Sequence, residues 1–582
     1  MGNDYIRSDQ LLKRKFVQYL IPTMTSYAAL SLNGFLDSMI VSNSLGSRAL
    51  AIVNLGTPLT LVFAAVYGLL GNGAAALYAL SLGKRDHEGA GKSLTAAMVM
   101  ALSVGLLIVA VGTVFFKPIS GLLCQDAELM EDFNQYLRVQ VLSAPLLTTL
   151  LTFTMILPSA GYPGYSMAIN LTANFINIVM DIVYIRIMHI GVVGAAWSTI
   201  TGYIAGLVLL VFLCLGKKIK MYVSSKIRDS LVLLKDVFKL GGPEAMTQVG
   251  FSLQFAFCNG LASSLAGTPG IVAIALCLQA NSIETIFLGS VMGSSVPIMS
   301  VLHGQCDFKG QTSMLKNALK WQLCMSAVLS AIISFFAPQV AGIFSVTEPA
   351  ELAVAVPALR FYCLMLFIRS GIILFFRYLK VIGFAGYAIL ISALDSFGVI
   401  IPVAWVLSRI FGITGLWMAF PTTALLILSF ILIRNYFISS HSNGHYKGLL
   451  LFENDESAKL LLDVTIMDDA DSIGGISEKM QAVCEENGID EKKAMLVALA
   501  VEEMAVYITG KKDHVAYMDI LVRKHRGNVI IDFRSLGHSF NPLMDSDEDS
   551  SENVRMLRGI ASSIETEYTL GMNSTRIVIK KK

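Results

Sequence analysis

Long apolar stretches fill the first 440 residues and are separated by short polar turns. Uncharged runs such as 51–82, 93–116 and 410–433 each exceed the length of about 20 residues that a helix needs to cross a bilayer. Cutting the chain at turn signals such as GKRD at 83–86 predicts about twelve transmembrane helices. Their expected ranges are 15–42, 48–82, 92–116, 134–159, 164–189, 192–216, 240–265, 271–304, 314–337, 353–379, 384–409 and 412–436.

After residue 440 the pattern changes to short strand-like and helix-like segments. Strands are predicted at 460–467, 516–523, 528–534 and twice near 566–580, and helices within 471–486, at 490–510 and at 554–564. Three helices and about five strands in roughly 130 residues are typical of a two-layer α/β sandwich. The expected fold is therefore an all-α polytopic membrane protein with a C-terminal α/β sandwich domain at 445–582.

Composition agrees with a chain that lies first in lipid and then in water. Of 582 residues, 54% are hydrophobic and 15% are charged, which excludes an ordinary soluble protein. Charged residues make up about 30% of the last 132 positions but about 10% of the rest. The net charge of +2, with no basic cluster among aromatic residues, argues against nucleic acid as a partner. The eight cysteines include no CxxC pair, so neither a disulfide framework nor a metal site is expected.

The charges of the predicted loops set the orientation. The 217–239 connection is rich in lysine and arginine, whereas 117–134 and 338–352 are acidic. Because basic loops stay in the cytoplasm, an even number of helices places both termini, and the charged tail, on the cytoplasmic side of the plasma (inner) membrane.

The chain also repeats itself at an offset of 221 or 222 residues. Pro22 recurs as Pro243, and Gly71 recurs as Gly293. The GVVGAAW run at 191–197 likewise recurs as GITGLW at 412–417. We therefore expect two six-helix lobes, 1–220 and 221–440, in a parallel repeat related by an axis along the membrane normal.

Acidic side chains inside membrane helices are costly and are candidates for function. At a rise of about 1.5 Å per residue, Asp37 lies roughly 12 Å, Asp181 about 15 Å and Thr199 about 12 Å below the outer surface. Asn177 lies one helical turn from Asp181 on the same face. Oxygen ligands around one or two carboxylates suit a proton or sodium site. The alternative is that these groups only bond neighbouring helices or, for Asp37, meet water at a helix end.

Other charged residues lie in the second half of the membrane region. The positions equivalent to Asp37 and Asp181 fall near Cys258 and Pro402, so the cation site is expected in the N-terminal lobe only. Glu284 could meet a cationic substrate or bond a neighbouring helix. Arg369 and Asp395, with Arg360 and Arg377, could form internal ion pairs. If such arginines instead line the central cavity, an anionic substrate is indicated.

Several of these segments together resemble one transporter family. FLDSMIVSNSLGSRALAIVNLGTPL, NFINIVMDIVYI with GVVGAAWST, and VPIMSVLHGQCDFKG look like the multidrug and toxic compound extrusion (MATE) family, over about residues 10–438. The resemblance implies antiport of H+ or Na+ against organic substrates. It also implies a cation site whose residues map onto Asp37, Asn177, Asp181 and Thr199.

The tail has a resemblance of its own. The segments 496–510, 537–543 and 558–573 are similar to the anti-sigma-factor serine kinases, which have a GHKL-type ATP-binding fold. Glu503 matches that family's glutamate, but Tyr507 stands where a magnesium-binding asparagine belongs. Ser535, with Gly537, replaces the Asp-x-Gly motif that contacts adenine. The resemblance thus implies a degenerate domain that binds ATP weakly or not at all.

The leading hypothesis is a secondary transporter, not an enzyme, that exports small organic compounds in exchange for H+ or Na+ and carries a cytoplasmic regulatory domain. A lipid-linked precursor flippase of the same superfamily is one alternative. A membrane sensor that controls a kinase-like signalling domain is another. The tail is expected to dock either on a cytoplasmic protein partner or through its acidic 545–552 loop on the basic 217–239 loop.

Overall fold

The protein is described by a computed structural model that covers residues 7–124, 126, 128–344, 346, 348–453, 458–467, 470–510, 517–525, 527–543 and 551–580. The chain divides into two compact units. The helical unit comprises residues 18–305 and 315–438, and the sheet unit comprises 1–17, 306–314 and 439–582. Each unit is described by itself.

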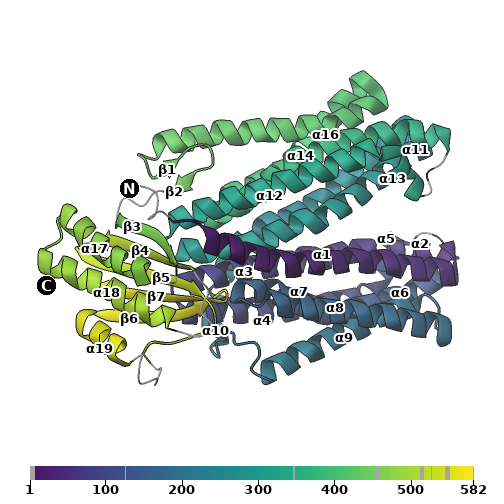
Figure 1. Ribbon diagram of the computed structural model, residues 1–582. Coiled ribbons are helices and arrows are strands. Elements are labelled where there is room, and N and C mark those ends of the chain that lie inside the picture. The colour runs from purple at the N-terminus through teal and green to yellow at the C-terminus, as the bar shows by residue number, and fades with distance from the viewer. Residues whose placement is uncertain are drawn as a thin grey trace. The chain divides into compact units, whose positions relative to one another are not determined.

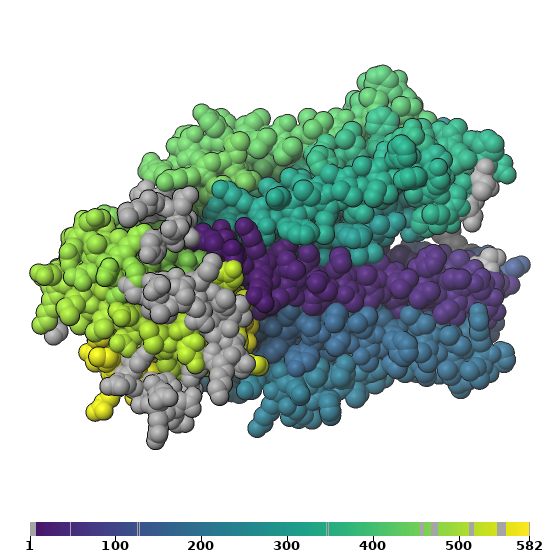
Figure 2. All heavy atoms as spheres, in the orientation of Figure 1, coloured from purple at the N-terminus to yellow at the C-terminus, as the bar shows by residue number. Residues whose placement is uncertain are grey.

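Helices build the whole of the helical unit (Figure 1), and Figure 2 shows the outer surface that their side chains form. Together with the helices that enter it from the sheet unit, its elements are α1 (Gln10–Leu45), α2 (Ser47–Leu55), α3 (Thr57–Gly83), α4 (His87–Val114), α5 (Phe116–Leu123), α6 (Met130–Leu142), α7 (Ala144–Ile156), η1 (Leu157–Ala160), α8 (Pro163–Asp181), η2 (Ile182–Ile187), α9 (Val193–Leu215), α10 (Ile227–Leu231), α11 (Leu234–Gly304), α12 (Phe308–Phe335), α13 (Ala337–Ile343), α14 (Pro349–Val381), α15 (Ala385–Ala393), η3 (Leu394–Gly398) and α16 (Ile400–His441).

Two glycines interrupt the longest helices. Helix α11 has 71 residues, about 107 Å if it were straight, more than three times the hydrocarbon thickness of about 30 Å. It breaks at Gly267, and α16 breaks at Gly412, each with φ 61°, a left-handed conformation that glycine adopts without strain. The sequence predicted helix boundaries next to both glycines, at 265 to 271 and at 409 to 412.

Among the described residues, eight helices are long and apolar enough to cross a membrane. A ninth is added if α6 and α7, with η1, form one bent span. This number is below the twelve expected from the sequence, for two reasons: α11 and the stretch 385–441 each count once, and α1 is not among the eight. The finding supports a polytopic helical membrane protein.

Helices α3 and α11 approach one another through glycine. A methyl group on Gly83 would lie 2.3 Å from the Val301 carbonyl oxygen, and one on Gly304 would lie 2.4 Å from that of Leu80. Small residues allow membrane helices such close backbone packing. The contact is reciprocal, because Leu80 and Gly83 are separated from Val301 and Gly304 by the offset at which the sequence repeats.

The sheet unit contains a five-stranded antiparallel sheet with the order β3-β4-β5-β7-β6. Its apolar face packs against helices, with Met480, Val501 and Met504 meeting Ile520 and Ile531 in one core. The strands are β3 (Ala458–Met467), β4 (Tyr517–His525), β5 (Asn528–Leu536), β6 (Ser563–Thr569) and β7 (Met572–Ile579), and the helices are α17 (Ala470–Glu486), α18 (Glu491–Thr509) and α19 (Ser551–Ile560). A short hairpin of β1 (Tyr446–Lys447) and β2 (Phe452–Glu453) precedes them.

Candidate functional site

The first group of polar residues lies where α1, α8 and α9 meet. Asp181 is the last residue of α8, directly before the π-helical turn η2. Such turns redirect side chains and are frequent at functional sites. Asp181 is fully buried, whereas Asp37 of α1 is half-buried.

Hydrogen bonds connect the members of this group. Ser198 Oγ donates to Asp181 Oδ1. Asn177 Nδ2 donates to Ser198 Oγ at 3.2 Å and to Thr199 Oγ1 at 3.3 Å. The carboxyl groups of Asp37 and Asp181 are in hydrogen-bonding contact. The structure thus brings together all four residues singled out from the sequence, and it adds Ser198, which the sequence analysis missed although it precedes Thr199.

Three oxygen atoms of this group have no hydrogen-bond partner among the described residues: Asp37 Oδ1, Asn177 Oδ1 and Asp181 Oδ2. No basic side chain among those residues forms an ion pair with either aspartate. Since a hydrogen bond between two carboxyl groups requires a proton, the pair can hold one. The free oxygens are equally of the type that binds a hard cation.

In the second group, Arg369 and Asp395 form an ion pair, whereas Glu284 is hydrogen-bonded to Ser326. Arg369 Nε donates to Asp395 Oδ2 at 2.7 Å, and both residues are buried, as is Glu284. Ser326 Oγ donates to Glu284 Oε1 at 2.6 Å. The internal ion pair that the sequence analysis considered for Arg369 and Asp395 is present. A role of these three residues in a substrate cavity stays a prediction.

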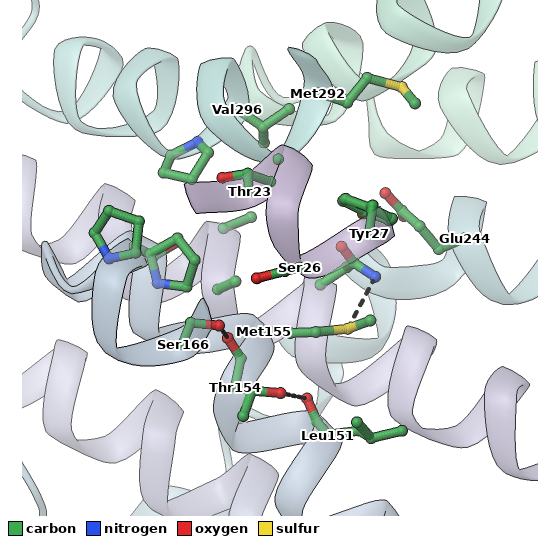
Figure 3. Close-up of a pocket in the computed structure, with 18 of the residues that line it drawn as sticks. Thr23, Ser26, Tyr27, Leu151, Thr154, Met155, Ser166, Glu244, Met292 and Val296 are labelled. Carbon is green, nitrogen blue, oxygen red and sulfur yellow. Dashed lines mark hydrogen bonds between the residues drawn. The ribbon is translucent and has the colours of Figure 1, made fainter. Parts of the chain in front are cut away.

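A cavity of about 210 Å³ lies between α1, α3, α7, α8, α11 and α14 (Figure 3). None of Glu284, Arg369 and Asp395 is among the described residues that line it. Its charged residues are Glu244, Arg377 and Lys380, which the sequence analysis did not select as a site. The sequence already indicated Glu244 and Arg377, because both interrupt stretches predicted to be helical, 240–265 and 353–379, whereas Lys380 lies one residue beyond the second stretch.

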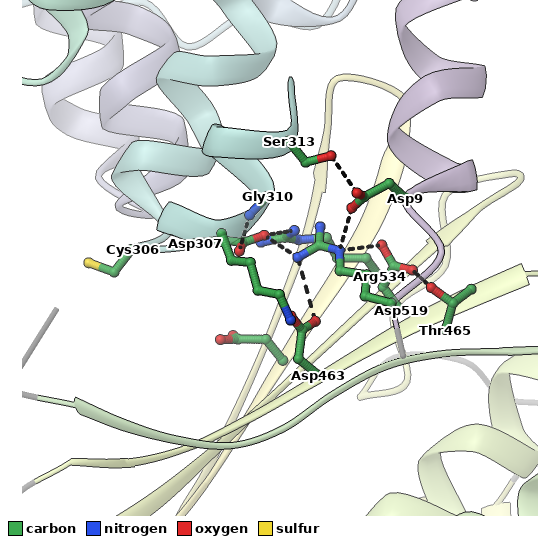
Figure 4. Close-up of polar contacts among 12 residues, drawn as sticks. Asp9, Cys306, Asp307, Gly310, Ser313, Asp463, Thr465, Asp519 and Arg534 are labelled. Carbon is green, nitrogen blue, oxygen red and sulfur yellow. Dashed lines mark hydrogen bonds and ion pairs between the residues drawn. The ribbon is translucent and has the colours of Figure 1, made fainter. Parts of the chain in front are cut away.

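A third polar group belongs to the sheet unit and surrounds Asp307 (Figure 4). Arg7 Nη1 donates to Asp307 Oδ2 at 2.8 Å, and Arg534 of β5 donates to the same oxygen. The Gly310 amide donates to Asp307 Oδ1 at 2.9 Å. Burial alone would raise the pKa of Asp307, but the guanidinium groups of Arg7 and Arg534 outweigh it and hold the pKa well below its usual range.

The partners of this group extend over one face of the sheet. The charged side chains alternate with the apolar ones that face the helices, as strand geometry requires. Arg523, Asp532 and Arg534 are buried although they lie on the polar face. The residues of this face that take part in ion pairs include Asp463, Asp519, Arg523, Asp532, Arg534 and Arg576.

The nucleotide-like residues of the tail lie around the loop after β5. Tyr507 is buried on α18, one turn beyond Glu503, and its ring meets that of Phe540 edge to face at 5.7 Å. Ser535 is buried, and Tyr568 Oη donates to the Gly537 carbonyl at 3.2 Å. The acidic loop 545–552, expected to dock on 217–239, lies largely outside the described residues.

Comparisons with known proteins cover mainly the first three quarters of the chain. The multidrug export protein MepA of Staphylococcus haemolyticus is 23% identical over 416 residues, 71% of this chain and 90% of that protein. MepA of Staphylococcus aureus (strain NCTC 8325) is 21% identical over 431 residues, 72% of this chain and 93% of that protein.

Solved structures share the fold at similar identity. An outward-facing multidrug resistance MATE transporter has a TM-score of 0.65 at 23% identity, over 74% of this chain and 97% of that one. A transporter of the MOP superfamily from Pyrococcus furiosus, described as having a binding pocket of reverse polarity, has a TM-score of 0.66 at 22% identity. That match covers 72% of this chain and 95% of the other.

The family model MatE matches twice, at residues 22–183 and at 243–406. The first match ends two residues beyond Asp181, and the second includes Glu244 and Asp395. The two matches begin at Pro22 and Pro243, the pair with which the sequence repeat starts. They cover more than half of the sequence, and the chain therefore belongs to the MatE family of membrane transporters.

Proposed function

We propose that this transporter exports small organic compounds across the plasma membrane in exchange for H+ or Na+. Asp37, Asn177, Asp181 and Thr199 form the coupling site, with Ser198 as a further ligand or hydrogen-bond donor. The observation that carries the proposal is the contact between two carboxyl groups that have free oxygens and no basic partner among the described residues. Export of organic compounds is also the activity named for the MepA relatives.

Either ion fits the same chemistry. A proton shared by Asp37 and Asp181 removes the repulsion between two buried carboxylates. A sodium ion would instead use the free oxygens of Asp37, Asn177 and Asp181 as hard ligands. Binding of the ion and of the substrate then favour different states of the transporter, which is the thermodynamic basis of exchange.

The membrane region is proposed to have twelve spans in two six-helix lobes, with both termini in the cytoplasm. The number of spans is supported by the helices: dividing α11 at Gly267 and α16 at Gly412, and adding α1 and the bent α6–α7 span, gives twelve. The reciprocal contact of Gly83 and Gly304 supports a two-fold relation between the lobes. Alternating access would follow from the movement of one lobe against the other.

The tail is proposed to be a regulatory domain of GHKL-like fold that binds ATP weakly or not at all. By the resemblance, Tyr507 stands where that family has a magnesium-binding asparagine, and its ring packs against that of Phe540. The ion pairs of Asp307 with Arg7 and Arg534 support regulation. They link the sheet to two segments that continue along the chain into α1 and α12.

Transport by the full chain in proteoliposomes tests the coupling. We expect an imposed proton or sodium gradient to drive accumulation of an organic dye, and Asp181→Asn to abolish the gradient-driven part. Asp132→Asn, which changes an exposed aspartate of α6, is the matched control and should transport normally. Undiminished gradient-driven transport by Asp181→Asn would remove this site from the mechanism.

A further inference from the structure

The cavity between α1, α3, α7, α8, α11 and α14 contains an uneven set of charges. Lys380 Nζ donates to Glu244 Oε1 at 2.6 Å, and Arg377 Nε lies 3.4 Å from the same oxygen. Arg377 and Lys380 are three residues apart on α14, so that both point to the same side of the helix. One carboxylate thus faces two basic side chains.

Glu244 can neutralise only one of these two bases. An arginine guanidinium stays protonated in proteins, and Arg377 Nε has no hydrogen-bond partner among the described residues. The side chain of Arg377 keeps 20% of its surface exposed, against 2% for Lys380. Lys380 is therefore the buried partner of Glu244, and Arg377 is the cation that remains available to a molecule in the cavity.

The rest of the lining suits a small organic molecule with one polar end. Hydroxyl and amide groups from Ser26, Tyr27 and Asn170 surround the cavity together with the apolar side chains of Met292 and Val296 (Figure 3). Ligand sites commonly combine apolar walls with a few polar groups that fix orientation. A volume of about 210 Å³ limits the occupant to about two fused rings.

We propose that this cavity binds small organic anions, compounds of one or two rings that carry a carboxylate or sulfonate, with Arg377 as the anion-binding residue. A guanidinium binds such oxyanions through charge-assisted hydrogen bonds. Binding of the anion does not depend on the proposed export function. The inference rests on that function only where it takes the bound anion to be the transported compound. Glu244 then sets the strength of binding, since it competes with the ligand for the cations.

Binding of two probes of equal size and opposite charge tests the proposal. Naphthalene-2-sulfonate and N-methylquinolinium are titrated against the full chain in lipid nanodiscs, followed by their fluorescence. We expect the wild type to bind the sulfonate more tightly than the quinolinium. Arg377→Gln should weaken sulfonate binding by about tenfold or more, which is the usual effect of losing a charged hydrogen-bond donor.

Two further variants keep the test independent of folding. Arg360→Gln changes an exposed arginine of the same helix and should bind as the wild type does. Glu244→Gln should strengthen sulfonate binding severalfold, a gain that a damaged protein cannot produce. Preference of the wild type for the quinolinium, or equal sulfonate binding by wild type, Arg377→Gln and Glu244→Gln, would overturn the proposal.

Exchange of the bound probe across proteoliposome membranes separates this inference from the export function. Sulfonate binding that depends on Arg377 but is accompanied by no exchange would contradict export and leave the anion site standing. Exchange of both probes without a charge preference would leave export standing and contradict the anion site.

Discussion

The two segments that match the MatE family differ in whether their carboxyl groups are paired with basic side chains. In the first, Asp37 and Asp181 meet each other and have no basic partner among the described residues. In the second, Asp395 is bonded to Arg369 and Glu244 to Lys380, while Glu284 accepts a hydrogen bond from Ser326. Asp181 lies directly before the π-helical turn η2, and Asp395 lies within the π-helical turn η3.

This difference suggests that the two segments have different roles, and the reason lies in how a buried carboxyl group is stabilised. A buried carboxyl group without a base is stabilised by binding a proton or a metal ion, so it responds to an ion gradient. A carboxylate that is paired with a base is already neutralised, and removal of one partner leaves a buried charge. We therefore expect ion coupling in the first segment, whereas the second holds Glu244 and Asp395 in ion pairs and has a cation, Arg377, at the cavity.

The largest effect is expected from the pair without a base. Asp37→Asn should lower gradient-driven efflux at least about 100-fold, the effect of losing one strong charged ligand, and the double variant Asp37→Asn/Asp181→Asn should be no worse. Groups that act as one unit show this lack of additivity. Initial rates in proteoliposomes give the comparison, and independent, multiplying losses would show that the two residues act separately.

A large effect on stability, but not on coupling, is expected in the second segment. Asp395→Asn leaves Arg369 buried without its partner and should cost about 3–5 kcal/mol of unfolding free energy. Asp395→Asn/Arg369→Gln should recover most of this loss. Thermal unfolding in detergent measures both variants. If Asp395→Asn abolished coupling while the protein kept its stability, the contrast between the segments would be wrong.

Asp307 of the sheet unit is a buried carboxylate outside the membrane spans, and it can be compared with those of the helical unit. Asp307→Asn removes a charged acceptor shared by Arg7 and Arg534, and we expect a loss of about 1.5–3 kcal/mol, visible as faster hydrogen exchange in 306–314 and in β5. Ser313→Ala, which removes only a neighbouring hydroxyl that donates to Asp9, is the control.

The pH dependence of this cluster has a definite sign. Because the folded-state pKa of Asp307 is lowered, its contribution to stability is complete above the unfolded pKa of about 3.9. It is lost only as pH falls further, through the lowered value. Hydrogen exchange in 306–314, corrected for its intrinsic pH dependence, should therefore report equal protection between pH 8 and pH 5. Loss of protection near pH 6 would contradict the assignment.

The smallest effect is expected at the nucleotide-like residues of the tail. Titration of the full chain with ATP and Mg²⁺ should show no micromolar binding, because Tyr507 packs on Phe540 and, by the resemblance, Ser535 stands where an adenine-binding aspartate is expected. Tyr507→Asn alone should not create such binding, since the aspartate is still missing. Micromolar affinity of the wild type would instead favour an active signalling domain.

Hydropathy along the chain was enough to predict the membrane helices and the positions of most elements of the tail. Apolar runs fixed the helices, and the breaks at Gly267 and Gly412 followed from local turn signals. The spacing of apolar residues predicted the strands and helices of the tail, with bounds that differ by only a few residues from those in the structure. The rise along a helix also placed Asp37, Asp181 and Thr199 at one depth, because depth depends on local geometry alone.

The partners of the charged residues depend on tertiary packing and could not be predicted from the sequence. Arg7 and Asp307 are 300 residues apart, and Glu244 and Lys380 are 136 apart, so no local period relates them. The helical rise predicts how deep a residue lies along its helix, but it does not predict which neighbouring helix the side chain faces. Packing sets that direction, and it placed Arg369 against Asp395 but Arg377 at the cavity. Which buried charge is neutralised and which remains available to a ligand is therefore a property of helix packing, not of sequence pattern.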